Sequence, residues 1–375
     1  MDNNDLRTVN NMNKNELNDK LKNECVVNER SINPIVKVNR LAYMRFGRKD
    51  LNEAIEFFKD FGLTLESQTG NQAYLRTIEN ASHALILEES SDEYSVTGFS
   101  VKNFQELEKL ARKMRVKIQS RDDALGGHFV QLVDPDKNLV EVNCGLNELS
   151  VQPHYQAAVE ANTPKLKTRF NDVVRPKLAP PPIARLGHTV LAVRKFKESV
   201  HWYQDTLGFI ASDFQMLEGH NIPTVGFLRC DQGDTPSDHH TLAIGSAVGV
   251  GHEHTAFEVT DIDLIAMGQK WLKHKKHHHS WGIGRHILGS QIFDYWRDPR
   301  GFQFEHYCDG DMFDNQVATE YCAFSGDSIS QWGPKITKDM LGTKPGIGLL
   351  VKVFKHLFSS TDLNMKRLVS LIKVT

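Results

Sequence analysis

Two stretches of the sequence, DPRGFQFE at 298–305 and DPDKNLVE at 134–141, share an Asp-Pro turn followed at the same spacing by a glutamate. Upstream of each lies another matched pair, HTAFEV at 254–259 and VTGFSV at 96–101. The pairs occur in the same order in both halves of the chain. We therefore infer an internal duplication, in which each copy is one structural module.

Each copy opens with an alternating stretch that is typical of a half-buried strand, LGH at 186–188 in one and LAY at 41–43 in the other. In the second copy the next apolar positions recur at helical spacing up to a closing glycine, and they are Phe196, Val200, Tyr203 and Leu207. The order strand, helix and several strands occurs twice in each copy. The sequence thus predicts an α+β fold of two tandem modules, each made of paired βαβββ units that form a curved mixed sheet around a metal cavity.

Composition marks the boundaries between these regions. The first segment is rich in Asn, Lys, Asp and Glu, so we expect a disordered arm, and a proline-rich stretch separates the two copies. The expected organisation is an arm over 1–34, an N-terminal metal-free module over 35–145, a linker over 146–182, a C-terminal metal-binding module over 183–311, and an extension over 312–375 that contains an amphipathic helix.

Composition also excludes several classes of protein. The 375 residues hold 45 Lys+Arg against 47 Asp+Glu, so no basic excess exists for binding nucleic acid. Five scattered cysteines form no CxxC pair, which argues against a disulfide scaffold or a zinc ribbon. No apolar run reaches the roughly 18 residues of a membrane span, and the acidic N-terminus lacks the apolar core of a secretory signal. We expect a soluble, cytoplasmic protein.

The two copies differ at three matched positions. The second copy has His188, His254 and Glu305 where the first has Tyr43, Val96 and Glu141. Two imidazoles and one carboxylate are the ligands of a facial triad, which leaves three positions open on Fe(II). The alternative is that each histidine is an ordinary core residue with a hydrogen-bond partner. The paired changes favour a metal site in the second copy alone.

Three further residues of the second copy add acid–base groups, namely His240, His286 and Tyr295. A histidine and a tyrosine near a metal offer a proton acceptor and an acid for a phenolic or peroxidic substrate. The first copy has Gln131 at the position that corresponds to Tyr295. Taken alone, Tyr295 could equally be a core tyrosine with a hydrogen-bonded hydroxyl.

The run GRH at 284–286, YWRDPRG at 295–301 and Glu305 resembles the signature of the type I extradiol catechol dioxygenases of the vicinal oxygen chelate superfamily. The resemblance covers about 36–311 and is stronger in the second copy. Members of this family also hold two such modules, with metal in the C-terminal one. The stretch 286–299 is most similar to members that act on substituted trihydroxybenzenes. Asp294 departs from the pattern, which has an apolar residue before the tyrosine.

The resemblance implies an oxidoreductase that inserts O₂ into a catechol or trihydroxybenzene and opens the ring beside the diol, as in aromatic hydrocarbon catabolism. It implies Fe(II), with Mn(II) as an alternative, held by His188, His254 and Glu305. His240 would be the acid–base histidine, and His286 and Tyr295 would hydrogen-bond the diol. It also implies a homo-oligomer.

Two other functions stay open at this point. A glyoxalase-like isomerase or hydrolase also chelates vicinal oxygens on a metal, and some members of the superfamily bind a ligand without catalysis. The histidine-rich stretch 274–279 could bind metal, although we expect an exposed loop. The apolar positions beyond about 343 are expected to pack on the body or on a neighbouring subunit rather than on a membrane surface.

Overall fold

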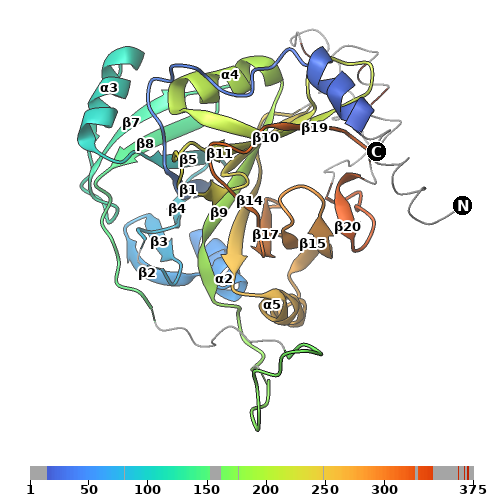
Figure 1. Ribbon diagram of the computed structural model, residues 1–375. Coiled ribbons are helices and arrows are strands. Elements are labelled where there is room, and N and C mark those ends of the chain that lie inside the picture. The colour runs from blue at the N-terminus through green and yellow to red at the C-terminus, as the bar shows by residue number, and fades with distance from the viewer. Residues whose placement is uncertain are drawn as a thin grey trace, which may run out of the picture.

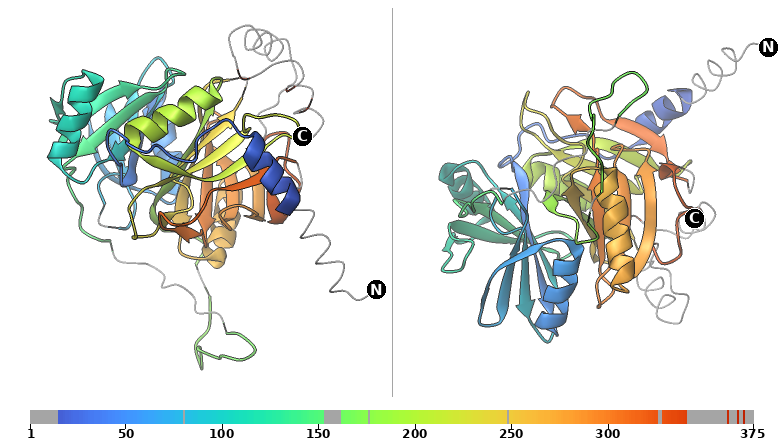
Figure 2. Two further views of the ribbon diagram at one scale, coloured as in Figure 1. Left: turned by 45° about the horizontal axis from the view of Figure 1, so that its top comes forward. Right: turned by 90° about the horizontal axis from the view of Figure 1, so that it is seen from below.

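The computed structural model describes residues 15–79, 81–152, 162–175, 177–247, 249–325 and 328–340, together with Asp362, Arg367 and Ser370. They form two mixed sheets that lie side by side, with helices packed against them (Figure 1 and Figure 2). The expected α+β fold of two tandem modules is confirmed. Within the described residues, no helix is both long and apolar enough to cross a membrane.

The first sheet has the strand order β2-β3-β4-β1-β5-β8-β7-β6. Its elements are β1 (Arg40–Arg48), α2 (Leu51–Phe61), β2 (Thr64–Thr69), β3 (Gln72–Arg76), β4 (Leu85–Glu89), β5 (Ser95–Ser100), α3 (Phe104–Met114), β6 (Gln119–Ser120), β7 (His128–Val133) and β8 (Leu139–Cys144). The side chains of Asp50 and Asn103 accept hydrogen bonds at the N-termini of α2 and α3, which explains where these helices begin.

The second sheet has the order β19-β10-β11-β13-β9-β14-β17-β16-β15-β20. Its elements are β9 (Ile183–Val193), α4 (Phe196–Leu207), β10 (Phe209–Met216), β11 (Val225–Cys230), β13 (Leu242–Ser246), β14 (Gly251–Val259), α5 (Ile262–His274), β15 (His278–His286), β16 (Ile292–Arg297), β17 (Gln303–Cys308), β19 (Glu320–Ala323) and β20 (Ser330–Trp332). The short strands β12 (Ser237–Asp238) and β18 (Met312–Phe313) pair with each other. Helix α4 has the expected bounds and ends at Gly208, whose φ is +76°.

Strand register confirms the duplication residue by residue. In the second module Ala256 on β14 pairs with both His188 on β9 and Glu305 on β17. In the first module Gly98 on β5 pairs with Tyr43 on β1 and with Glu141 on β8 in the same way. The backbone therefore presents equivalent positions in both modules, and the difference between them lies in the side chains.

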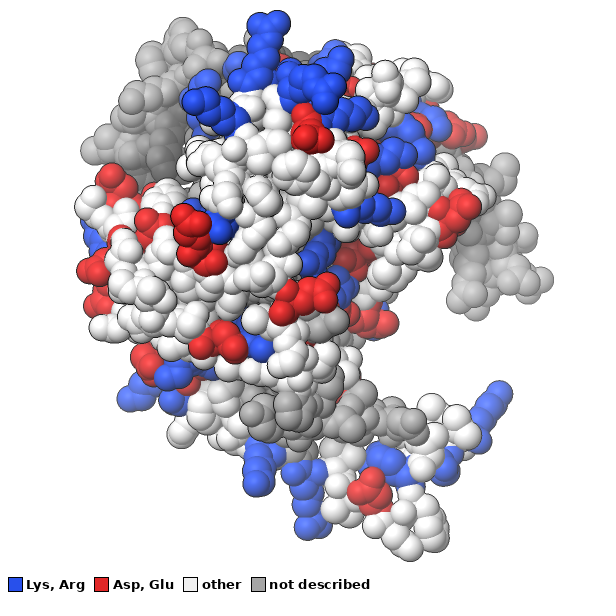
Figure 3. All heavy atoms as spheres, turned by 90° about the vertical axis from the view of Figure 1, so that its left-hand side faces the viewer, with Lys and Arg blue, Asp and Glu red and all other residues white. Residues whose placement is uncertain are grey.

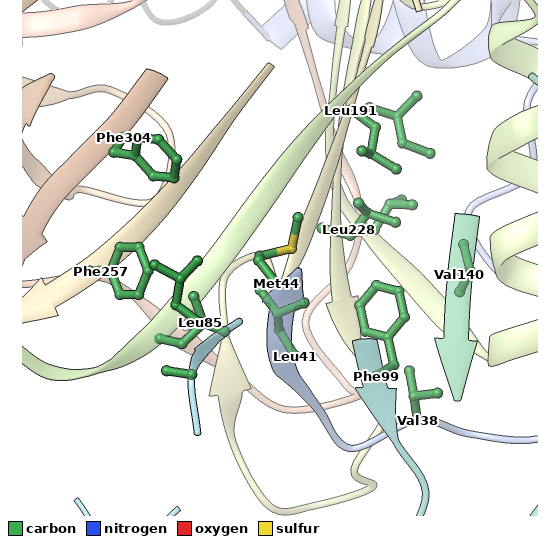
Figure 4. Close-up of a cluster of buried hydrophobic side chains, with 14 of the residues drawn as sticks. Val38, Leu41, Met44, Leu85, Phe99, Val140, Leu191, Leu228, Phe257 and Phe304 are labelled. Carbon is green, nitrogen blue, oxygen red and sulfur yellow. The ribbon is translucent and has the colours of Figure 1, made fainter. Parts of the chain in front are cut away.

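One apolar cluster runs through both modules (Figure 4). Phe304 of β17 lies against Phe58 of α2, with ring centroids 4.8 Å apart, and against Phe46 of β1 at 5.5 Å. His306 of the same strand donates a hydrogen bond to the carbonyl oxygen of Phe61 at 2.7 Å. Because β17 also carries Glu305, the packing between the modules fixes the strand that holds the candidate ligand.

The Asp-Pro turn of each module contacts the other module. Arg48 at the end of β1 forms an ion pair with Asp298 at 2.9 Å, with side chains only 0% and 1% exposed. Reciprocally, Asp136 accepts hydrogen bonds from the backbone N–H groups of Arg194 and Lys195, both at 2.8 Å, just before α4. The two copies thus bind each other through the motif that revealed the repeat.

The termini differ from expectation. Residues 1–14 of the expected disordered arm lie outside the described residues, but 15–24 is helical, and Leu21 and Val27 are buried in the core. Apolar residues at Leu17, Leu21 and Cys25 fall at helical spacing, which gives this segment a face to bury.

Beyond residue 311, β18, β19 and β20 extend the second module, so its strands continue past the expected boundary. The amphipathic helix expected from about 343 lies outside the described residues.

Over the face drawn in Figure 3, acidic and basic side chains are interspersed, apart from a group of basic ones along the upper edge.

Arg48→Ala should destabilise the protein by about 3–5 kcal/mol, because it leaves the Asp298 carboxylate buried without its partner. Burial lowers the pKa of Arg48 and raises the pKa of Asp298, which shows that removing these groups from water is costly. Urea unfolding measures the effect. Lys59→Ala, which breaks the exposed pair with Glu56, is the control and should change the midpoint little. Equal midpoints for the two variants would contradict this account of the interface.

Candidate metal centre

Three neighbouring strands bring the candidate ligands together. His188 lies on β9, His254 on β14 and Glu305 on β17, and these strands lie side by side in the second sheet (Figure 1). The Nε2 atoms of His188 and His254 are each 3.3 Å from Oε2 of Glu305. One ligand atom from each residue lies within 4.8 Å of the others. Residues far apart in sequence therefore form a compact donor set of two imidazoles and one carboxylate.

The three candidate ligand side chains are buried, and several of their polar atoms lack a hydrogen-bond partner. The side chains of His188, His254 and Glu305 are 2%, 9% and 1% exposed. Both carboxylate oxygens of Glu305, and Nε2 of His254, lack a partner with hydrogen-bond geometry among the described residues. Burying a carboxylate in this way is costly unless a cation neutralises it. The donor set fits a divalent transition metal with open coordination positions.

Neighbouring side chains orient the two imidazoles. Nδ1–H of His254 donates to the carboxylate of Glu253, which aims Nε2 at Glu305. The amide nitrogen of Gln291 lies 3.5 Å from Nδ1 of His188. Nδ1 of His254 is therefore engaged away from the centre, as is typical of histidines that ligate a metal.

The electrostatics show the same demand for positive charge. Burial lowers the pKa of His188, whereas the carboxylates of Glu253 and Glu305 overcome burial and raise the pKa of His254 to about 10. Burial also opposes ionisation of Glu305, but the two neighbouring histidines, each 3.3 Å away, hold its pKa well below the usual range. The carboxylates of Glu253 and Glu305 therefore favour a positive charge at this place.

His240, His286 and Tyr295 line the same cavity, which has a volume of about 220 Å³. The His240 ring lies 4.1 Å from that of His188, and the Tyr295 ring lies 5.2 Å from that of His254. The structure thus brings all six predicted site residues to one place.

Hydrogen bonds define the protonation of the His286–Tyr295 pair. Nδ1–H of His286 donates to the carbonyl oxygen of Ile329 at 3.0 Å, so Nε2 accepts from the Tyr295 hydroxyl, also at 3.0 Å. Burial lowers the pKa of His286 and raises the pKa of Tyr295. The pair is therefore neutral, with a phenol hydroxyl held at a defined position beside the candidate ligands.

Part of the cavity wall comes from a segment that the sequence did not indicate. Apolar side chains of the sheet form one side, including Val190, Val225 and Phe227. Residues of the C-terminal segment form the other, including Phe324, Ile329, Ile336 and Met340. No repeat or motif marks these residues, because the first module has no equivalent of this segment.

In the first module the equivalent position has a different partner. Glu141 forms an ion pair with Arg121 and another with Arg45 at 3.2 Å, and it accepts a hydrogen bond from the Tyr43 hydroxyl. Guanidinium groups here neutralise the carboxylate, and Val96 offers no ligand. Within the described residues no cluster of three potential ligands other than His188, His254 and Glu305 occurs. The carboxylate of the first module thus has ion-pair partners where that of the second module has two histidines.

Asp294, the departure from the signature, lies away from the cavity. It is fully buried, and its carboxylate accepts hydrogen bonds from His279 at 2.8 Å, Gln269 at 3.0 Å and Trp296 at 2.7 Å. Burial raises the pKa of Asp294. Since adjacent residues of a strand point to opposite faces, the substitution before Tyr295 leaves the candidate site unchanged.

The histidine-rich stretch 274–279 contains the largely exposed connection between α5 and β15 that we expected, at residues 275–277. His278 and His279 begin strand β15, and only His278 of the last three is largely exposed. His277, His278 and His279 pair with three different carboxylates, those of Asp60, Asp339 and Asp294. Because these partners are separate, the three histidines do not converge on a common metal site.

Comparison with known proteins agrees with this geometry. Residues 185–306 match the model of the Glyoxalase/Bleomycin resistance protein/Dioxygenase superfamily. Metapyrocatechase 2 of Cupriavidus necator is 30% identical over 208 residues, which are 55% of this chain and 61% of that protein. The chain therefore spans less than two thirds of that relative. The iron-dependent extradiol dioxygenase of Rhodococcus jostii (strain RHA1) is 23% identical over 317 residues, covering 80% of this chain and 97% of that protein.

Solved structures share the fold. A homoprotocatechuate 2,3-dioxygenase of Brevibacterium fuscum, in complex with 3,4-dihydroxyphenylacetate, has a TM-score of 0.68 at 17% identity and covers 84% of this chain and 94% of its own. A Mn(II)-bound glyoxalase from Novosphingobium aromaticivorans has a TM-score of 0.67 at 21% identity, with coverages of 83% and 95%.

The chain thus has a vicinal oxygen chelate fold, as the sequence motifs predicted, and its residues 185–306 match the glyoxalase/bleomycin resistance/dioxygenase superfamily. Within the superfamily, curated relatives that it resembles carry the names of extradiol dioxygenases.

Glu305→Gln should abolish stoichiometric metal binding, because the amide keeps the size of the side chain but removes its charge. Glu141→Gln alters the equivalent position of the first module and is the matched control. We expect the wild type and the control to bind one Fe(II) per chain, and Glu305→Gln to bind at least about tenfold more weakly. Metal analysis after anaerobic loading measures this, and equal loss in both variants would refute the assignment.

Proposed function

We propose that the protein is an extradiol ring-cleaving dioxygenase that acts on a catechol or trihydroxybenzene. The observation that carries this proposal is the buried donor set of His188, His254 and Glu305, placed in one cavity with His240 and the His286–Tyr295 pair. A metal-dependent reaction of a phenolic diol needs open coordination positions and acid–base groups beside them. The names of the curated relatives support the same reaction class.

The metal would be Fe(II) held by His188, His254 and Glu305, and Mn(II) suits the same donors. Bound there, Fe(II) would supply chelation of both diol oxygens and electron exchange between the diol and O₂. Glu253 would keep the imidazole of His254 aimed at it.

The remaining residues handle the diol and its protons. The Tyr295 hydroxyl, held by His286, would hydrogen-bond one diol oxygen and fix the orientation of the ring. His240 lies against His188 and would take up a proton from the diol and return it later in the reaction. Burial lowers the pKa of His240 well below its usual value, so it begins as a neutral proton acceptor.

The cavity favours a small apolar substrate. Its volume of about 220 Å³ lies below the roughly 300–1,000 Å³ of pockets for drug-sized ligands, and side chains such as Phe227, Phe324 and Ile336 line it. We infer a diol with a single aromatic ring and an apolar substituent that contacts the C-terminal segment.

Iron-loaded protein should consume O₂ when mixed with a catechol or trihydroxybenzene and should form a yellow ring-opened product. Anaerobic loading with Fe(II), followed by a panel of such diols in air, measures O₂ uptake and absorbance together. The apoprotein is the control. Turnover of a substrate without O₂ uptake would favour a glyoxalase-like isomerase, and tight binding of a diol without turnover would favour a ligand-binding protein.

His240→Gln should lower kcat by about 10²- to 10⁴-fold, because the amide cannot accept and return a proton. Iron content should stay at one per chain, since His240 is not a member of the donor set. His83→Gln alters a buried histidine of the first module and is the control. Oxygen-uptake kinetics and metal analysis test both statements, and equal loss of iron in His240→Gln would contradict the assigned role.

A further inference from the structure

A carboxylate and a second histidine lie behind His240, on the side away from the metal ligands. Nε2–H of His239 donates a hydrogen bond to the carboxylate of Asp213 on β10. Nδ1 of His239 lies 2.9 Å from Nδ1 of His240. All three side chains are buried, with exposed fractions of 4%, 2% and 4% for Asp213, His239 and His240. A continuous hydrogen-bonded chain therefore leads from Asp213 to the cavity.

The position of His239 is fixed by its backbone. Its carbonyl oxygen accepts from the Ser212 hydroxyl at 2.6 Å, and that hydroxyl accepts from Arg229 at 2.9 Å. Its N–H donates to the carbonyl oxygen of Asp311 at 2.8 Å. These bonds tie the residue to β10 on one side and to the segment before β18 on the other.

The ring of His239 is also enclosed. Phe227 and Phe313 lie with their ring centroids 5.6 Å and 5.2 Å away. Gly289 approaches so closely that a Cβ atom there would lie 2.9 Å from Nδ1 of His239. The ring thus has little freedom to turn, and its two nitrogens remain directed at Asp213 and His240.

The hydrogen-bond pattern selects one tautomer of His240. A carboxylate only accepts, so Asp213 keeps the proton of neutral His239 on Nε2 and leaves Nδ1 as an acceptor. His240 must then carry its own proton on Nδ1. Its remaining nitrogen, Nε2, is left as an unprotonated acceptor for a molecule in the cavity.

We propose that Asp213 and His239 are positioning residues, which hold His240 in the orientation and tautomer that accept a proton from a bound diol. In this step the diol O–H bond breaks, its electron pair stays on the diol oxygen, and the proton forms a bond to Nε2 of His240. The proposal rests on the proposed function, since it concerns the proton acceptor of that reaction.

Two variants test the relay in the full-length, iron-loaded protein. Asp213→Asn keeps the shape, but its amide both donates and accepts, so the tautomer of His239 is no longer enforced. His239→Phe keeps a flat ring beside Phe227 and Phe313 but removes both hydrogen bonds. His83→Phe makes the same change at a buried histidine of the first module and is the matched control.

We expect kcat to fall at least about tenfold in both relay variants, which is part of the roughly 10²- to 10⁴-fold that acid–base catalysis supplies. Iron content and KM for the diol should change little. The control should match the wild type. If His239→Phe fails to load iron, Asp213→Asn alone decides the outcome.

A second readout needs no turnover. The absorption spectrum of 4-nitrocatechol, bound anaerobically to the iron-loaded protein, reports how many of its hydroxyls have lost a proton. The relay variants should shift this spectrum towards the form that has lost fewer protons. Spectra and kcat values equal to those of the control would overturn the proposal. Absence of O₂ uptake in the wild type would instead refute the proposed function, while the spectral comparison would still decide the role of the relay.

Discussion

The structure depends on one buried negative charge. Glu305 is almost completely enclosed, and neither of its oxygens has a partner with hydrogen-bond geometry among the described residues. Such a group is tolerated only where a cation neutralises it and where the strand that carries it cannot shift. His188 and His254 complete the candidate donor set. Packing of Phe304 and the buried Arg48–Asp298 pair fix β17 against the first module.

The first module shows the alternative solution to the same problem. Glu141 has the register position of Glu305, but Arg121 and Arg45 neutralise it and the Tyr43 hydroxyl donates to it. A carboxylate at this register position can therefore either pair with arginines, as on β8, or belong to a candidate set of metal ligands, as on β17. Side chains from neighbouring strands decide between a closed ion-pair network and an open set of ligands, although the backbone arrangement is shared.

In the second module, three histidine rings are each held by a partner at one ring nitrogen. Glu253 holds His254 through Nδ1, the carbonyl oxygen of Ile329 holds His286 through Nδ1, and His239 engages Nδ1 of His240. The other nitrogen, Nε2, is left for the cavity in His254 and His240, and it accepts from the Tyr295 hydroxyl in His286. A ring whose one nitrogen is engaged by a fixed partner has a defined tautomer, which is the condition for ligation or proton transfer at the other.

The sequence by itself determined the duplication and the α+β modules and indicated the six candidate site residues, because strand periodicity and matched positions in two copies are local patterns that can be read in one chain. It did not reveal the packed helix at 15–24, the wall formed by Phe324 and Met340, or the contact of His239 with Asp213, 26 residues away. These features have no counterpart in a repeat or a motif. Only the tertiary structure decided them, because they arise where strands distant in sequence become neighbours and where a buried polar group must find its partner.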